Sequence, residues 1–475
     1  MSVTDGGTPL PPRAGPVIDA DGHVVEPLDA WAGLPEAHRP VITSDAHGYE
    51  HVTVGRTEIL AVPLGTLARP GSTFDDPTAF RPLADAEPGG SDPVARLADM
   101  DTEGIDQAVL YPTLGLYFSV VEDAEAAVGL AVDYNDWLAT YCASDPDRLF
   151  GAALLPLQDP AAAAHELRRA VTQLGFKAGF VRPNPCLGRS LSDRAYDVVW
   201  NAAEELGVPV GIHEGSSVIV PTLGSDRPFN PLVLHAVSHS FEQMLACAQL
   251  IAFGVLERLD EQAESFGGFC PDMALRPSEY FARQCTISFE VDERTLPALA
   301  PFVGPRRIVW GSDYPHHDAT FPGAIDALRA TIAPCPTATQ IRVLGLNARE
   351  LYGLPPRHDG VVGLIDDYFA AVTAQDPELL RRVFAPDATF DVDGDRRRGY
   401  EDILAYYTEH TFVFEDFRPD PAPLQIDGST VTVDIDVHLG GSERTVRDVF
   451  ETDGERITAL RVRGFADALR AAGPR

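Results

Sequence analysis

The sequence lacks several features that would tie the protein to a membrane, to nucleic acid or to an oxidising compartment. No apolar run approaches the roughly 20 residues that a helix needs to cross a bilayer. Basic side chains are scarce: 37 Lys and Arg stand against 71 Asp and Glu, and a net charge of −34 repels nucleic acid and anionic membranes. The six cysteines are scattered without a CxxC pair, so we expect reduced thiols with packing roles.

The N-terminal segment also lacks a targeting signal. Residues 1–15 are polar and rich in Pro and Gly, without the basic and apolar regions of a signal peptide, so we expect a disordered lead-in and a cytoplasmic protein. The overall composition is that of a globular protein, with 45% hydrophobic and 23% charged residues. A length of 475 residues favours two or three domains.

Residues 16–355 alternate between short apolar runs and helical patterns. The apolar runs have the length of buried strands and lie at Val17–Ile18, Ile105–Tyr111, Leu149–Pro156, Ala178–Val181, Val208–Ile212, Cys285–Phe289 and Arg307–Trp310. Nearly continuous apolar strands between helices indicate a parallel sheet that is covered on both faces. The length of this alternation predicts an α/β fold, a (β/α)8 TIM-type barrel, and the lack of a GxGxxG turn argues against a dinucleotide-binding sheet.

The pattern changes near residue 359. Apolar residues from Val361 to Phe384 follow a helical period, and the later segments alternate apolar and polar residues as half-exposed antiparallel strands do. Asp427-Gly428 and Asp453-Gly454 are typical of hairpin turns. We therefore predict a smaller α+β domain over residues 359–475.

Metal-ligating residue types follow three of the predicted strands. Asp21 and His23 are two positions apart, so on an extended segment both point to one side. His213 follows the strand VPVGI, and Asp313 follows IVWGS. Active sites of such barrels lie at the C-terminal ends of the strands, and these ligand types suit one catalytic metal ion with open positions. The alternative for each residue is a solvated or hydrogen-bonded strand end.

The motifs VIDADGHVVEP, GGSDPVARLADMDTEGID, HEG, PSEYF, WGSDYPHHD and LNARELYGL occur in this order. Together they resemble the metal-dependent amidohydrolase-related family, which includes aminocarboxymuconate-semialdehyde decarboxylase and benzoate-type decarboxylases. The resemblance implies a barrel over residues 16–355 with a single divalent metal ion, commonly zinc or manganese. It carries the ligand roles to Asp21, His23, His213 and Asp313. It also implies a small carboxylated substrate, aromatic or cyclic, that is either hydrolysed or decarboxylated.

Further residues are candidates for chemistry or substrate binding. Asp313 is the best candidate for moving a proton, because the resemblance gives the eighth-strand Asp both roles. His239, followed by Glu242, could face the pocket, or could cap or pack a helix. Arg182 could bind a substrate carboxylate through two parallel hydrogen bonds, or could pair with a neighbouring acid. The remaining candidates lie beside strand ends and are expected to shape the substrate pocket: Tyr111, Tyr314, His316 and Glu290.

Lys177 is an unsuitable metal-bridging residue. It precedes the fourth strand, at the face of the barrel that serves stability, so we reject a carbamylated lysine there.

The C-terminal domain resembles the SnoaL-like, nuclear-transport-factor-2-like cone fold. The resemblance implies an apolar pocket and a tendency to dimerise, so we expect a homo-oligomer. Five polar residues could point inward, although alternation favours solvent for most of them: Asp391, Asp434, Asp436, His438 and Arg463.

The stretch between HEG (213–215) and QCTISFE (284–290) contains no good sixth strand. Helical periodicity runs from Phe241 onwards, although Leu250–Val255 could convert to a strand. A lost strand would open the barrel and leave edge backbone groups unpaired. Two alternatives to a barrel enzyme therefore stay open. The barrel could be a degenerate ligand-binding scaffold beside a functional cone domain, or the cone domain could itself catalyse.

Overall fold

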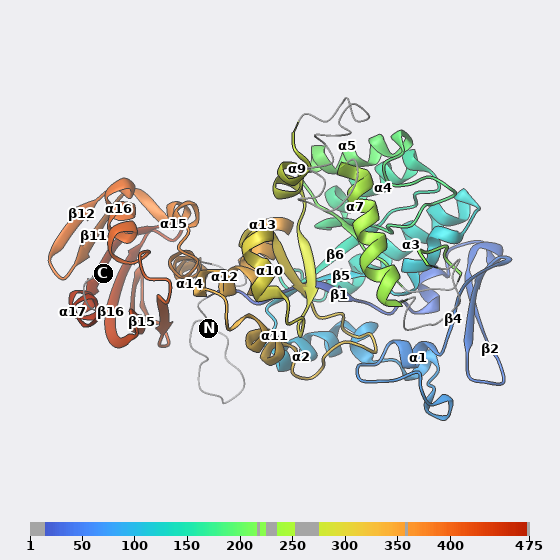
Figure 1. Ribbon diagram of the computed structural model, residues 1–475, viewed down its shortest axis with the longest axis horizontal. Helices are drawn as coiled ribbons and strands as arrows, with labels where there is room; N and C mark the ends of the chain where they lie inside the picture. The colour runs from blue at the N-terminus through green and yellow to red at the C-terminus, as the bar shows by residue number, and fades with distance from the viewer. Residues whose placement is uncertain (1–14, 216–218, 225–234, 252–274, 357–359, 473–475) are drawn as a thin grey trace.

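The computed structural model describes residues 15–215, 219–224, 235–251, 275–356 and 360–472 (Figure 1). The predicted lead-in over residues 1–15 lies outside this part except for its last residue, and most of Leu250–Val255 lies outside it as well. None of the helices within these ranges combines the length and the apolar content that a membrane crossing requires.

The larger, N-terminal part is built on parallel strands. Five of them form one sheet in the order β1-β5-β6-β7-β8, with bounds Ile18–His23, Gln107–Tyr111, Leu149–Leu154, Ala178–Val181 and Val210–Ile212. Strands β9 (Ile287–Glu290) and β10 (Ile308–Gly311) form a parallel pair. The chain after β10 lies against β1, because Asp313 N–H donates to the Asp21 carbonyl at 3.2 Å and His23 N–H donates to the Tyr314 carbonyl at 2.8 Å.

Helices cover the outside of these strands (Figure 1). The main ones are α2 (Pro93–Glu103), α3 (Ala124–Cys142), α4 (Pro160–Gln173), α5 (Asp197–Leu206), α7 (Gln243–Ile251), α9 (Pro277–Gln284), α10 (Leu296–Val303), α11 (Ala324–Ile332), α12 (Thr337–Ile341) and α13 (Asn347–Tyr352). Asp92 and Asp159 cap α2 and α4 through their side chains, and each is followed by Pro at the first helical position. Both choices favour a helix start at that point. A short helix α1 (Leu64–Leu67) and a hairpin sheet of β2 (Pro40–Ser44), β3 (Glu50–Val54) and β4 (Thr57–Val62) complete this part.

The described strands form a TIM-barrel-like half-barrel rather than the closed eight-stranded barrel of the sequence prediction. No strand occurs among the described residues between Ile212 and Ile287. Every residue of β5, β6 and β7 is buried, whereas all three residues of β8 are half-buried and β9 is partly exposed. Within the described residues, β8 pairs only with β7 and β9 pairs only with β10.

The C-terminal part is an α+β domain around a mixed sheet. Its strands are β11 (Phe384–Val392), β12 (Asp395–Arg398), β13 (Arg418–Pro421), β14 (Gln425–Asp427), β15 (Thr430–Leu439), β16 (Ser442–Thr452) and β17 (Ile457–Arg463). The order is β12-β11-β17-β16-β15-β13, with β14 beside β15. The helices are α14 (Gly360–Thr373), α15 (Pro377–Val383), α16 (Tyr400–His410) and α17 (Phe465–Ala472). The antiparallel prediction misses one pairing, because β11 and β17 run parallel.

Helix α14 joins the two parts. Its Ala370 and the following Ala374 pack in the N-terminal core, while its Ile365 and Phe369 pack in the C-terminal core. Beside it, the buried carboxylate of Asp376 pairs with the guanidinium of Arg342 from the barrel part. The two cores therefore share one helix and a buried ion pair.

Candidate metal centre

Three polar residues of strand β1, and Glu26 just after it, point in different directions. Asp21 and His23 face one point, with Asp21 Oδ1 3.7 Å from His23 Nε2. Asp19 turns elsewhere: its carboxylate accepts the backbone N–H of Ser312 at 3.0 Å and the Ser312 hydroxyl at 2.6 Å, which fastens β1 to the chain after β10. Glu26 accepts three backbone N–H groups of the segment after β5, from Thr113, Leu114 and Gly115.

His23 presents a lone pair to the centre. Its Nδ1 lies 2.9 Å from the carbonyl oxygen of Pro112, which can only accept, so Nδ1 carries the proton. Nε2 is then the unprotonated nitrogen, and it is buried without a hydrogen-bond partner. Burial, followed by the charges of His316 and His213, holds the pKa of His23 well below its usual range. A neutral imidazole whose second nitrogen is fixed by a carbonyl is the form that ligates metals.

Asp313 reaches the centre from the turn after β10. Its Oδ1 lies 3.2 Å from His23 Nε2. The backbone of Asp313 has a φ of 54°, in the left-handed region that few residues other than Gly adopt. Strained backbone of this kind is often found at functional sites, where the surrounding structure holds it in place.

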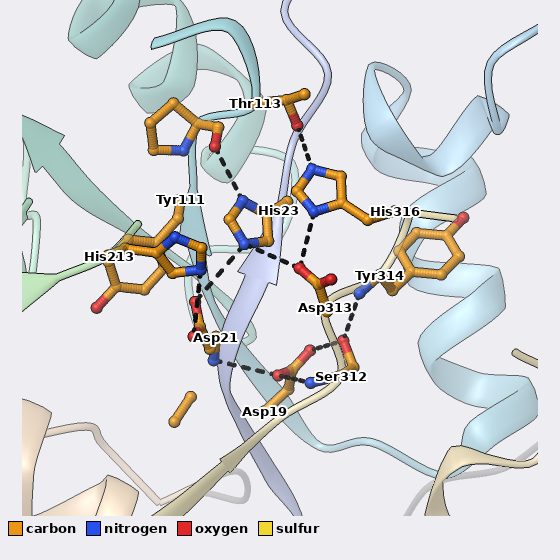
Figure 2. A network of polar contacts seen from close by, with 12 residues as sticks. Asp19, Asp21, His23, Tyr111, Thr113, His213, Ser312, Asp313, Tyr314 and His316 are labelled. Carbon is orange, nitrogen blue, oxygen red and sulfur yellow. Dashed lines mark hydrogen bonds and ion pairs between the residues drawn. The ribbon is translucent and has the colours of Figure 1, made fainter. Parts of the chain in front are cut away.

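His213 completes the set from the end of β8. Its Nε2 lies 3.6 Å from Asp21 Oδ2, and its ring packs edge-on against that of His23, with centroids 4.8 Å apart. Figure 2 shows the four predicted ligands, Asp21, His23, His213 and Asp313, converging from three strand ends. Three of these side chains also have a buried atom without a hydrogen-bond partner: Asp21 Oδ1, His23 Nε2 and His213 Nδ1.

The donor set fits a divalent cation. Two carboxylates and two imidazoles are ligands of zinc and manganese sites with open positions. Burial raises the pKa of Asp21 to about 6, and burial together with the neighbouring carboxylate of Asp318 raises the pKa of Asp313 well above its usual range. Asp21, His23 and His213 place one ligand atom each within 4.8 Å of one another, as do His23, Asp313 and His316.

His316 forms a hydrogen-bonded chain behind Asp313. Thr113 donates its hydroxyl proton to the Val24 carbonyl at 2.6 Å, so it accepts from His316 Nε2 at 2.9 Å. A neutral His316 then offers the lone pair of Nδ1 to Asp313 Oδ1, 2.8 Å away. Burial lowers the pKa of His316 to about 3, which agrees with a neutral ring. One proton therefore lies between Asp313 Oδ1 and His316 Nδ1.

Other predicted site residues are engaged in supporting contacts. Every guanidinium nitrogen of Arg182 has an acceptor, including Glu214 Oε1 at 3.1 Å and the Gly215 carbonyl at 2.7 Å. Arg182 therefore forms the ion pair with a neighbouring acid that was the alternative to binding a substrate carboxylate. Tyr111 stacks on His213 with centroids 6.1 Å apart and directs its hydroxyl to Tyr352.

Two further predicted pocket residues are Tyr314 and Glu290. The Tyr314 ring points away from the centre (Figure 2). Its hydroxyl donates a hydrogen bond to Asp99. Glu290 is exposed at the end of β9. Lys177 lies 6.0 Å over the Phe150 ring, which is consistent with its exclusion as a ligand.

His239 lies on a π-helical turn, Ser238–Glu242, and contacts the centre through Glu214. Its Nε2 is 3.4 Å from Glu214 Oε2. Burial lowers the pKa of His239 to about 3. Glu242, the partner weighed from sequence, instead accepts the backbone N–H of Leu223 at 2.5 Å. The structure thus connects Arg182, Glu214 and His239 in one chain.

Sequence reasoning missed Thr113, Glu214 and Asp318 as parts of this site. Asp318 hydrogen-bonds to Asp313 and is the last residue of the quoted run WGSDYPHHD. Glu214 directly follows a candidate ligand, and Thr113 is the second residue after β5. All three follow strand ends, which was the available signal, yet the side-chain directions came from tertiary contacts.

Comparison with known proteins places the chain. The profile of the amidohydrolase family matches residues 18–354, and that of the SnoaL-like domain matches residues 365–460. The chain belongs to the amidohydrolase family. Both matches confirm the resemblances drawn from sequence, while the domain limits 16–355 and 359–475 stay predictions.

Two curated relatives of this amidohydrolase are decarboxylases. 2-Amino-3-carboxymuconate-6-semialdehyde decarboxylase of Dictyostelium discoideum is 28% identical over 288 residues, which are 56% of this chain and 77% of the relative. Gamma-resorcylate decarboxylase of Rhizobium radiobacter is 28% identical over 292 residues, 55% of this chain and 87% of the relative.

Solved structures share the fold of the larger part. An amidohydrolase of Mycobacterium avium subsp. paratuberculosis has a TM-score of 0.60 at 25% identity, covering 72% of this chain and 98% of that one. The 5-carboxyvanillate decarboxylase of Sphingomonas paucimobilis has a TM-score of 0.54 at 25% identity, covering 72% and 99%. A 5-carboxyvanillate decarboxylase of Novosphingobium aromaticivorans, determined with manganese, has a TM-score of 0.50 at 20% identity, covering 72% and 96%.

Proposed function

We propose that this amidohydrolase is a metal-dependent decarboxylase of a small aromatic or cyclic carboxylate. One observation carries the proposal. Asp21, His23, His213 and Asp313 meet at three strand ends with the lone pair of a neutral imidazole facing two carboxylates. The relatives named as decarboxylases of 2-amino-3-carboxymuconate-6-semialdehyde and gamma-resorcylate support the reaction type.

The four candidate ligands would hold one divalent ion. We expect zinc first. Because the Novosphingobium structure contains manganese, the metal analysis should measure manganese as well. When bound, such an ion orients a substrate carboxylate and neighbouring oxygen and stabilises negative charge.

Residues of the chain would then deliver a proton to the substrate. Decarboxylation replaces the ring-to-carboxylate bond by a ring-to-hydrogen bond and releases CO2, so one proton must be delivered to the ring carbon. Asp313 Oδ1 can deliver this proton, and the His316 Nδ1 lone pair at 2.8 Å keeps that atom oriented. Glu214, 3.4 Å from His239 Nε2, would position His239 at the edge of the site.

Hydrolysis could use the same ligands, so the products decide between the two reactions. Decarboxylation yields CO2 and a ring with one carboxylate fewer, whereas hydrolysis yields no CO2. The screen should therefore follow CO2 release together with loss of ring-carboxylate absorbance, across hydroxylated and methoxylated benzoates.

The first test is elemental analysis of the purified full chain beside His213→Ala and Asp313→Ala. We expect about one zinc or manganese per chain, with metal affinity weakened at least about 100-fold in both variants. Asp436→Ala, an exposed carboxylate of the C-terminal sheet, is the matched control and should keep the metal. A folded wild-type chain that binds no divalent metal would refute the proposal.

A second candidate function is binding without turnover. The gap between β8 and β9 favours it, because these two strands do not pair within the described residues. A chain that holds its metal and binds carboxylated aromatics, but neither releases CO2 nor forms a hydrolysis product, would support this function over catalysis.

A further inference from the structure

The C-terminal domain contains a cavity of its own, away from the candidate metal centre. The cavity and its mouth enclose about 420 Å³, a volume that includes the solvent-open space at the mouth. Apolar side chains from helix α14 and from the sheet make up most of the lining, including Phe369, Val372, Phe390, Ile435 and Val462.

A carboxyl group lies among these apolar side chains. Along β16 the residues Val446, Asp448 and Phe450 share the buried face, so Asp448 occupies a position where alternation predicts an apolar residue. Asp448 is 3% exposed and lines the cavity. Its Oδ1 has no hydrogen-bond partner in the described structure. Such groups are rare in folded proteins, because an unsatisfied buried oxygen costs free energy.

Two tyrosines accompany Asp448 at the cavity wall. The hydroxyl groups of Tyr368 and Tyr407 are 2.7 Å apart, and Tyr368 also hydrogen-bonds to the Asp448 carboxyl group. Both tyrosines are buried. Burial raises the pKa of Asp448 to about 8, so at neutral pH the group is a carboxylic acid that can donate a hydrogen bond.

The cavity offers nothing that would neutralise an anion. None of the described residues that line it is Arg, Lys or His. Transfer of a carboxylate from water into such surroundings is strongly unfavourable, whereas a neutral ring gains from burial.

We propose that this cavity binds a neutral ring compound through one hydrogen-bonding oxygen, held by Asp448, Tyr368 and Tyr407, and that it excludes the corresponding carboxylate. The identity of the ligand can also be inferred, and this step rests on the proposed function. When the substrate carries a single carboxylate, the ring that a decarboxylase releases is such a neutral compound, whereas its precursor is an anion. The C-terminal domain would then hold product and reject substrate.

The test compares phenol with benzoate on the full-length, metal-loaded chain by isothermal titration calorimetry. We expect phenol to bind at least tenfold more tightly than benzoate. Asp448→Leu should weaken phenol binding about tenfold, and Asp448→Asn, which keeps a donor, should restore most of it. Asp436→Leu, the same change on the solvent face of neighbouring β15, should have no effect.

The His213→Ala variant separates the cavity from the barrel. Phenol binding that survives in His213→Ala and falls in Asp448→Leu places the ligand in the cavity. Equal affinity for benzoate, or phenol binding that follows His213 instead of Asp448, would overturn the inference. Cavity binding without CO2 release would refute only the proposed function, and CO2 release without cavity binding would refute only this inference.

Discussion

The two parts of the chain both bury carboxyl groups beside aromatic rings, yet they compensate them differently. In the barrel part, Asp21 and Asp313 keep 22% and 31% of their side chains exposed and lie within 4 Å of a histidine nitrogen. In the C-terminal part, Asp448 is 3% exposed and has tyrosine hydroxyls and apolar groups around it. Several carboxylates and neutral imidazoles together need a cation, whereas a lone carboxyl group in an apolar cavity can become neutral by keeping its proton.

The largest expected effect concerns Asp313. Asp313→Asn removes the group that carries the proton beside His316, so kcat should fall about 10²- to 10⁴-fold. The measurement is steady-state CO2 release at saturating metal, with metal content determined on the same samples. Asp436→Asn should retain full activity, and an active Asp313→Asn protein would contradict the assignment.

The second effect is the pH dependence of the free energy of unfolding that Asp448 causes. Its folded-state pKa of about 8 lies above the ordinary value of 3.8, so between these two pH values the folded chain binds more protons than the unfolded chain. The free energy of unfolding should therefore fall as pH rises through this window, by about 1.4 kcal/mol per pH unit from this group. Tyr368 and Tyr407, which face Asp448, have pKa values raised well above 10.0 by burial and stay neutral there.

Asp448→Asn should remove this contribution. Urea unfolding at a series of pH values from 4 to 8, followed in wild type and variant, measures the difference in slope. Identical slopes in the two proteins would mean that Asp448 is ionised in the folded state.

The smallest expected effect is the loss of stability when one hydroxyl is removed from each of the two buried tyrosine pairs. Tyr111→Phe removes a hydroxyl 3.1 Å from that of Tyr352, and Tyr407→Phe removes one 2.7 Å from that of Tyr368. Each change should lower the free energy of unfolding by about 1 kcal/mol. Metal content should not change in either variant, because the Tyr111 hydroxyl is directed to Tyr352. Loss of metal in Tyr111→Phe would place that hydroxyl in the centre instead.

The positions of the four candidate ligands could be predicted from the sequence more readily than the directions of the side chains around them. Parallel strands bring their C-terminal ends to one edge, so Asp21, His23, His213 and Asp313 could be grouped from position alone. Arg182 and Tyr314 also follow strand ends, but their side chains point to Glu214 and Asp99. Strand position locates a backbone, whereas the direction of a long side chain depends on partners that are distant in sequence.

The C-terminal domain shows the same limit. Alternation predicted that Asp434 and Asp436 face solvent, and the structure places them half-buried and exposed on the outer side of β15. The same alternation puts Asp448 in phase with Val446 and Phe450, a signal present in the sequence but overlooked beside the more numerous polar residues.

By itself, the sequence determined the family, the order of strands and helices, the likeness of the second domain and the residue types at three strand ends. These features depend on local periodicity and on motifs. Only the tertiary structure decided the tautomer of His23, the contact between Asp313 and His316 and the cavity around Asp448. Each of these depends on burial and on contacts between residues far apart in the chain, because hydrogen-bond partners and desolvation exist only after folding.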